Sequence, residues 1–149
     1  MNYDLKNLLD EIRKSAKLRI ESAKTSHKMF FCIYLAKYAY AYATAKFQQE
    51  IFDLTENAKV MMVVIVAFRD SAKSTICTTS FPLWSILTGR AKFVIIAGNT
   101  RAQARQHLAN IREEVENNEL LKNDLGPFKS QHDEWGAYSM VFPKYGAKI

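Results

Sequence analysis

The first part of the chain has apolar residues at helical spacing. Five of them share one face, with lysine and glutamate on the other: Leu5, Leu8, Leu9, Ile12 and Ala16. A polar break at residues 24–28 precedes an apolar, aromatic run over residues 29–45, and residues 46–59 carry a further helical pattern. The pattern therefore predicts amino-terminal helices up to about residue 59.

Two short apolar runs interrupt this helical pattern. Residues 60–67 read VMMVVIVA and residues 91–99 read AKFVIIAGN. Continuous runs rich in β-branched residues are typical of strands that are buried on both faces of a parallel sheet. Between these two runs, residues 73–89 have a helical pattern. Pro82 should kink this helix or end its regular part, and Gly89 should close it.

The remainder of the chain predicts one long helix and a hairpin. Thr100 is a suitable N-cap for a helix that runs to about Asn117. From Gly126 the pattern changes, and residues 138–149 alternate as in two short strands. This order of elements predicts an α/β domain with a mostly parallel sheet. Because only two parallel-type strands precede Ile149, we expect the sequence to be a truncated domain.

Composition narrows the class of protein. The chain has 149 residues, enough for one domain with a core, and 48% of them are apolar. Its two cysteines lie far apart and its three histidines are isolated, so no metal-ligand spacing is seen. No secretory signal is visible, and the run at 29–45 is short for a bilayer crossing and contains Lys37. We expect a protein that is not secreted and has no membrane partner.

The net charge of +6 is unevenly distributed. Residues 1–48 hold nine lysines and arginines against four acids, whereas residues 100–149 hold seven of each. A basic amino-terminal third is compatible with a nucleic-acid or acidic partner, but we favour the interpretation that it is a solvated helix face.

The stretch VVIVAFRDSAKST, residues 63–75, has the outline of a phosphate-binding loop. Lys73 stands where such loops carry the lysine that reaches the β- and γ-phosphates, and Ser74 follows as the magnesium-binding hydroxyl. Ala67 and Ala72 occupy the two glycine positions, so the loop can bind phosphate only if its backbone tolerates a Cβ there. The alternative is an ordinary turn in which Ser71 caps the helix and Lys73 points into solvent.

The sequence of the loop, and that of the later helix that begins after Thr100, resemble the ATPase domain of the large terminase subunit of tailed bacteriophages. That family uses a loop of the form R-x-x-x-K-[ST], and Arg69 and Lys73 have this spacing. The later helix follows the family's pattern A-x-x-x-L-x-x-I-R-x-E, through Ala104, Leu108, Ile111, Arg112 and Glu114. The aromatic segment before residue 50 resembles the family's lead-in to an adenine-contacting glutamine. Gln48 or Gln49 would correspond to it, with Gln48 preferred.

The resemblance implies a role for each residue of the loop. Lys73 would hold the phosphates, Ser74 would ligate Mg²⁺, and Arg69 would stabilise the γ-phosphate during hydrolysis of ATP. The ATP site would further include Asp70, Ser71, Ala72 and Thr75, with Gln48 at the adenine. The implied fold is a P-loop NTPase with a mostly parallel sheet and helices on both faces, over residues 59–149, after a helical lead-in over residues 1–58.

The resemblance also implies a biological setting. The complete enzyme would be an ATPase that drives double-stranded DNA into a procapsid, in the cytoplasm of the host cell. Its partners would be the portal protein, the small terminase subunit and further copies of itself. The chain contains no apolar strand ending in two acids, since Asp133-Glu134 follows a polar stretch, so we expect this fragment alone to be inactive. Another P-loop NTPase, helicase-like or kinase, and a non-enzymatic α/β module remain as alternatives.

Overall fold

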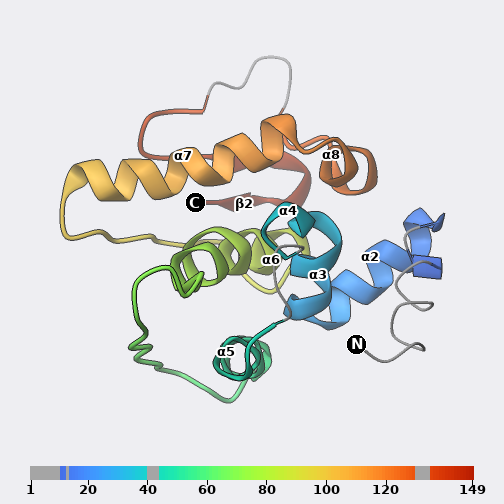
Figure 1. Ribbon diagram of the computed structural model, residues 1–149. Coiled ribbons are helices and arrows are strands. Elements are labelled where there is room, and N and C mark those ends of the chain that lie inside the picture. The colour runs from blue at the N-terminus through green and yellow to red at the C-terminus, as the bar shows by residue number, and fades with distance from the viewer. Residues whose placement is uncertain (1–10, 13, 40–43, 130–134) are drawn as a thin grey trace. The chain divides into compact units, whose positions relative to one another are not determined.

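The computed structural model describes residues 11, 12, 14–39, 44–129 and 135–149. The chain divides into two compact units, Met1–Ile76 (unit 1) and Cys77–Ile149 (unit 2). Helices dominate both units (Figure 1). The boundary predicted between residues 58 and 59 stays a prediction. The expected helix face at Leu5, Leu8 and Leu9 lies outside the described residues.

The described residues of unit 1 include four short helices. They are α2 (Ala16–Thr25), α3 (His27–Tyr34), α4 (Ala36–Ala39) and α5 (Lys46–Glu56). Ser26 ends α2, where its N–H donates to the Ser22 carbonyl at 3.2 Å, and it begins α3, where its hydroxyl accepts the N–H of Met29 at 3.2 Å. Glu56, the last residue of α5, accepts hydrogen bonds from the Ser26 hydroxyl at 2.8 Å and the Lys28 N–H at 3.0 Å. A carboxylate thus stabilises the amino terminus of α3.

Aromatic side chains pack α5 against α3. Phe52 is 2% exposed, and its ring lies 5.4 Å from that of Phe31 and 5.0 Å, edge-on, from the ring of His27. The Nδ1 atom of His27 is 2.7 Å from the hydroxyl of Thr55. Burial lowers the pKa of His27 to about 3, so the imidazole is neutral at physiological pH.

The chain passes into unit 2 through a helical stretch with an irregular start. A π-helical segment, η1 (Thr75–Ser80), leads into α6 (Phe81–Leu87), whose first turn contains Pro82. Proline lacks an N–H donor and is tolerated in a first turn, so regular α-helix begins at this proline rather than ending there. Gly89 follows with φ of 77° and closes the segment, which confirms the prediction for this glycine.

The described residues of the second part of unit 2 form two helices and a hairpin. Helix α7 (Arg101–Asn117) begins where the Thr100 hydroxyl accepts the N–H of Gln103 at 3.2 Å, as predicted. Asn118 separates it from α8 (Glu119–Leu125), which the sequence pattern did not distinguish. Strands β1 (Val141–Phe142) and β2 (Ala147–Lys148) then pair in antiparallel register around the 3-10 turn η2 (Pro143–Tyr145). The predicted hairpin is confirmed.

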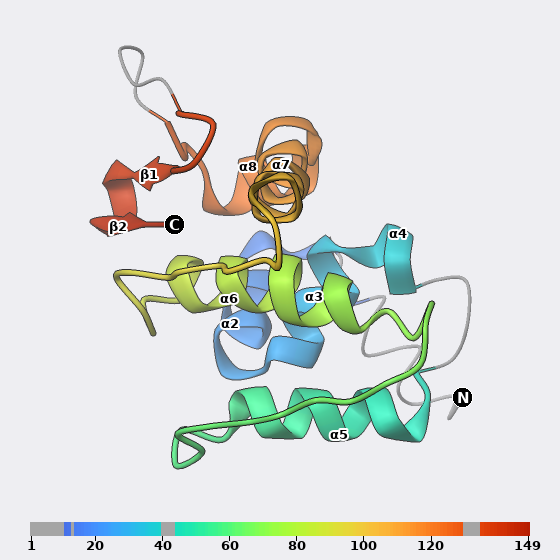
Figure 2. The ribbon, with the colours of Figure 1, turned by 90° about the vertical axis from the view of Figure 1, so that its left-hand side faces the viewer.

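The predicted parallel sheet is wrong. The described part of the chain contains one sheet, and that sheet is the two-stranded antiparallel hairpin. Residues 60–67 pair with no strand, and Met61 and Val66 are 95% and 91% exposed. Figure 2 shows this stretch running alongside α5. Residues 91–99 make a single parallel bridge, between Phe93 and Lys148. The fold is therefore α-rich, not a mostly parallel P-loop sheet with helices on both faces.

The reason for this difference is physical. A β-branched apolar run shows that a segment suits a strand, but a strand also needs hydrogen-bonding neighbours, which the local pattern does not specify.

The described helices include none long and apolar enough to cross a membrane.

Candidate functional site

The predicted loop surrounds a hollow in unit 1. Nine consecutive residues, Ala67 to Thr75, line a cavity of about 450 Å³. Helical structure begins at Lys73, within the last three residues of this stretch. The order expected from the sequence, an apolar run followed by a loop and a helix, is therefore present, although the apolar run forms no strand.

The backbone of the loop is left-handed at two non-glycine residues. Asp70 has φ of 63° and Ala72 has φ of 60°. The sequence analysis allowed phosphate binding only if the backbone tolerates a Cβ at this position, and in the structure the Cβ of Ala72 stands on a left-handed residue. The left-handed conformation costs an L-residue about 1–2 kcal/mol, and such strain is concentrated at functional sites. Alternation of this kind curves a chain so that successive N–H groups face a common concavity, the geometry of backbone anion-binding nests.

Three N–H groups of the loop are available as donors. Those of Ser71, Ala72 and Lys73 donate no hydrogen bond within the described residues, whereas the Ala72 carbonyl already accepts the N–H of Ile76 at 3.0 Å. Ser71 is only 3% exposed. The first N–H groups of any helix lack intrahelical acceptors and carry partial positive charge, so an anion in the hollow would satisfy them.

Lys73 folds back across the loop. Its Nζ donates to the carbonyl of Ala67 at 3.2 Å, so the ammonium group closes the ring of residues around the hollow. The remaining predicted residues are placed as follows: Arg69, Asp70 and Ser74 are exposed, and Thr75 is half-buried. All of them line the hollow, so the structure brings the predicted phosphate-binding residues together.

Helix α5 holds the loop through two adjacent side chains. The Nε2 of Gln48 donates to the carbonyl of Ser71 at 3.1 Å, and its Oε1 accepts the N–H of Ala45 at 3.0 Å. Phe47 contacts Phe68 with its ring at 5.3 Å in a T-shaped arrangement. Gln48 therefore lies at the loop as predicted from the resemblance, but both ends of its amide are used to connect α5 to the loop.

Gln49, the other candidate for adenine contact, is placed elsewhere. Its Nε2 donates to a carboxylate oxygen of Asp53 at 2.7 Å, and its Oε1 accepts a hydrogen bond from Lys28. The structure thus joins Gln48, and not Gln49, to the loop. The contact between Gln48 and Ser71 was missed by sequence reasoning because 23 positions separate the two residues.

The donor set of the hollow suits a phosphate group. Backbone N–H groups, a lysine ammonium and hydroxyl groups are the ligands that nucleotide phosphates use. Among the described residues, no three histidine, cysteine, aspartate or glutamate side chains gather as a metal site. The Mg²⁺ expected at Ser74 would therefore be held mainly by that hydroxyl and by phosphate oxygens. The Asp133-Glu134 pair lies outside the described residues.

The geometry of the loop and the sequence motif of residues 67–75 both point to phosphate binding. The resemblance to the terminase family rests on that motif and on the sequence of α7. Comparison of the chain with models of protein families, with curated proteins and with solved structures finds no match.

Proposed function

We propose that the loop Ala67–Thr75 binds the phosphate groups of ATP together with Mg²⁺. The observation that carries the proposal is the pair of left-handed residues, Asp70 and Ala72, in a loop whose N–H groups at positions 71–73 have no acceptor among the described residues. An ordinary turn gains nothing from this strain, whereas an anion-binding loop uses it to aim its donors. A cavity of about 450 Å³ accommodates a triphosphate.

In this proposal, the residues of the loop contact different parts of the bound Mg–ATP. The N–H groups of Ser71, Ala72 and Lys73 contact phosphate oxygens. The Lys73 ammonium exchanges the Ala67 carbonyl for the phosphate, a stronger, charge-assisted partner. Ser74 supplies a hydroxyl to Mg²⁺. Because Gln48 is engaged with Ser71, its contribution is to fix the loop rather than to read adenine.

The wider role follows from the resemblance alone. In this role, ATP is hydrolysed to move double-stranded DNA into a procapsid, and Arg69 stabilises the γ-phosphate. The chain acts with a portal protein, a small terminase subunit and further copies of itself. Phosphate release from ATP, measured with and without DNA for the wild type and Arg69→Ala, tests this role. For a chain that also contains an apolar strand ending in two acids, the role predicts phosphate release that DNA stimulates and that Arg69→Ala abolishes. Binding without release in such a chain would favour a non-enzymatic module.

Isothermal titration of Mg–ATP against the wild type and Lys73→Ala tests the binding proposal. Lys59→Ala is the matched control, because Lys59 is an exposed lysine of the same unit outside the loop. We expect binding to the wild type and to the control, and a loss of at least about tenfold in Lys73→Ala, since a charge-assisted hydrogen bond contributes about 1.5–3 kcal/mol. No binding to the wild type, or equal losses in the two variants, would refute the proposal.

A further inference from the structure

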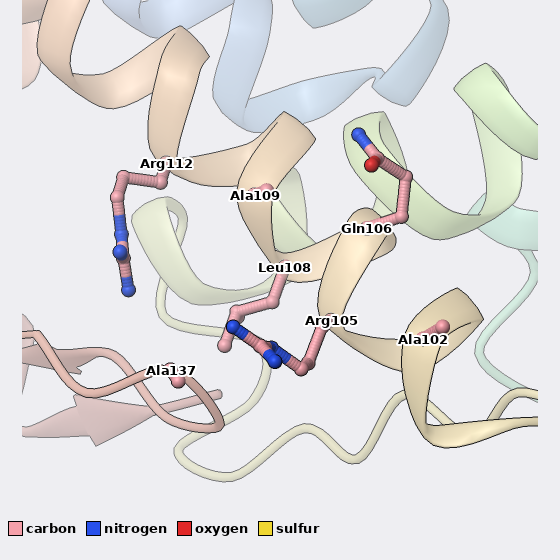
Figure 3. A pocket seen from close by; sticks show the side chains of 7 residues that line it. All are labelled: Ala102, Arg105, Gln106, Leu108, Ala109, Arg112 and Ala137. Carbon is pink, nitrogen blue, oxygen red and sulfur yellow. The ribbon is translucent and has the colours of Figure 1, made fainter.

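A second hollow lies in unit 2, between α7 and the turn at residues 136–139. Its volume is about 340 Å³. The lining residues are Ala102, Arg105, Gln106, Leu108, Ala109, Arg112 and Ala137. Figure 3 shows the side chains of Arg105 and Arg112 extending from the helix toward the turn that carries Ala137, with Gln106 directed away. We call this feature the arginine groove.

Two arginines, Arg105 and Arg112, line this groove, and Arg101 lies one turn before Arg105 on α7. Arg101, Arg105 and Arg112 fall within a narrow sector of α7, because steps of four and seven residues return to nearly the same side of a helix. The eleven residue steps from Arg101 to Arg112 span about 16 Å at 1.5 Å per step. No acidic residue occurs between positions 101 and 112, and the acids of α7 follow at 113, 114 and 116.

This order of charges is unfavourable to the helix itself. The amino terminus of a helix carries partial positive charge, so arginines there and glutamates at the other end each cost about 0.3–1 kcal/mol. Helix α7 has no acid in its first turn and no base in its last turn. Helix stability therefore does not explain Arg101 and Arg105, whereas binding of an anion does, since the dipole and the guanidinium groups then act on it together.

The aromatic ring of Tyr138 does not line the hollow itself but lies next to it, in contact with Arg105. Tyr138 is 64% exposed, and the guanidinium of Arg105 lies over its ring at 5.6 Å. Arg112 donates to the carbonyls of Gly136 at 2.6 Å and Trp135 at 3.4 Å, so it positions the turn that presents the tyrosine. The groove thus joins a basic face to an exposed aromatic side chain on a turn that is fixed to the helix.

The floor of the groove limits the kind of anion. Three alanines and Leu108 line it, and its lining includes no acid. Free phosphate would use the arginines but neither the apolar floor nor the tyrosine, and duplex DNA keeps its base faces stacked inside the helix. Phosphates combined with exposed, stackable bases are the chemistry of a single strand. We propose that the arginine groove binds single-stranded nucleic acid, with phosphates on Arg101 and Arg105 and a base on Tyr138.

Fluorescence anisotropy with a labelled oligothymidylate of about 16 nucleotides tests this proposal. Tyr138→Ala should weaken binding about fivefold or more without changing the salt dependence, and Tyr138→Phe should retain it. Arg105→Gln should weaken binding and reduce the slope of log K against log salt by about 0.7, the value for one phosphate contact on a single strand. Lys122→Gln, which removes an exposed-face charge on α8 next to Glu119, is the matched control and should leave the slope unchanged.

Three results would overturn the proposal. The first is absence of binding at low salt. The second is an equal loss in Lys122→Gln and Arg105→Gln, which would indicate only general attraction to a basic chain. The third is binding of a duplex of the same length as tightly as the single strand, or displacement of the strand by inorganic phosphate at comparable concentration. Both Arg105 and Tyr138 are exposed, so their substitution should preserve the fold, and circular dichroism of each variant checks this.

Discussion

Replacing Ala72 by glycine should stabilise the protein, although glycine usually destabilises. Ala72 has φ of 60°, a conformation that costs an L-residue about 1–2 kcal/mol and glycine almost nothing. Glycine gains conformational freedom in the unfolded chain, which offsets about 0.4–1 kcal/mol of this relief. The net expectation for Ala72→Gly is an increase of about 0.5–1 kcal/mol in the free energy of unfolding.

Urea unfolding followed by circular dichroism measures this difference. Ala67→Gly is the matched control, because Ala67 belongs to the same loop but does not have a positive φ. It should lose about 0.5–1 kcal/mol, so the two variants should shift in opposite directions. A loss in Ala72→Gly as large as that in Ala67→Gly would show that residue 72 is not held in the left-handed conformation, and the description of the loop would fail.

Two further predictions concern unit 1. Gln48→Ala should weaken binding of Mg–ATP about two- to tenfold, because the hydrogen bond to the Ser71 carbonyl is lost. The control variant, Gln49→Ala, should bind Mg–ATP like the wild type. Equal losses in the two variants would contradict the role given to Gln48. The pKa of His27 is about 3 in the fold against 6.5 unfolded, so its contribution is complete above pH 6.5 and is lost as pH falls toward 3. Urea unfolding should show a loss of about 2 kcal/mol at pH 5 relative to pH 8, and no such loss would refute the burial of a neutral imidazole.

The features that the sequence predicted correctly depend on neighbouring residues. Thr100 begins α7 by bonding to an N–H three positions away, and Gly89 closes its segment through its own φ. The terminal hairpin likewise pairs Phe142 with Ala147 across a short turn. Patterns of this kind need no knowledge of distant residues.

The features that failed depend on distant residues. Residues 60–67 carry a strand-forming composition, but their pairing would require another strand at the right place, and the described chain supplies none. The positive φ of Ala72 is equally hidden, because the pattern predicts glycine at such positions and an alanine there is strained. The candidate site was located because Lys73 and its neighbours are contiguous, whereas the attachment through Gln48 joins separate segments.

The most direct test of the account is an NMR titration of the isotope-labelled chain with Mg–ATP and with inorganic triphosphate. If the loop binds phosphates through its backbone, the amide resonances of Ser71, Ala72 and Lys73 should shift most with both ligands, and should stay in place in Lys73→Ala. Amides in this loop that do not move, or larger shifts elsewhere in the chain, would contradict phosphate binding at residues 67–75.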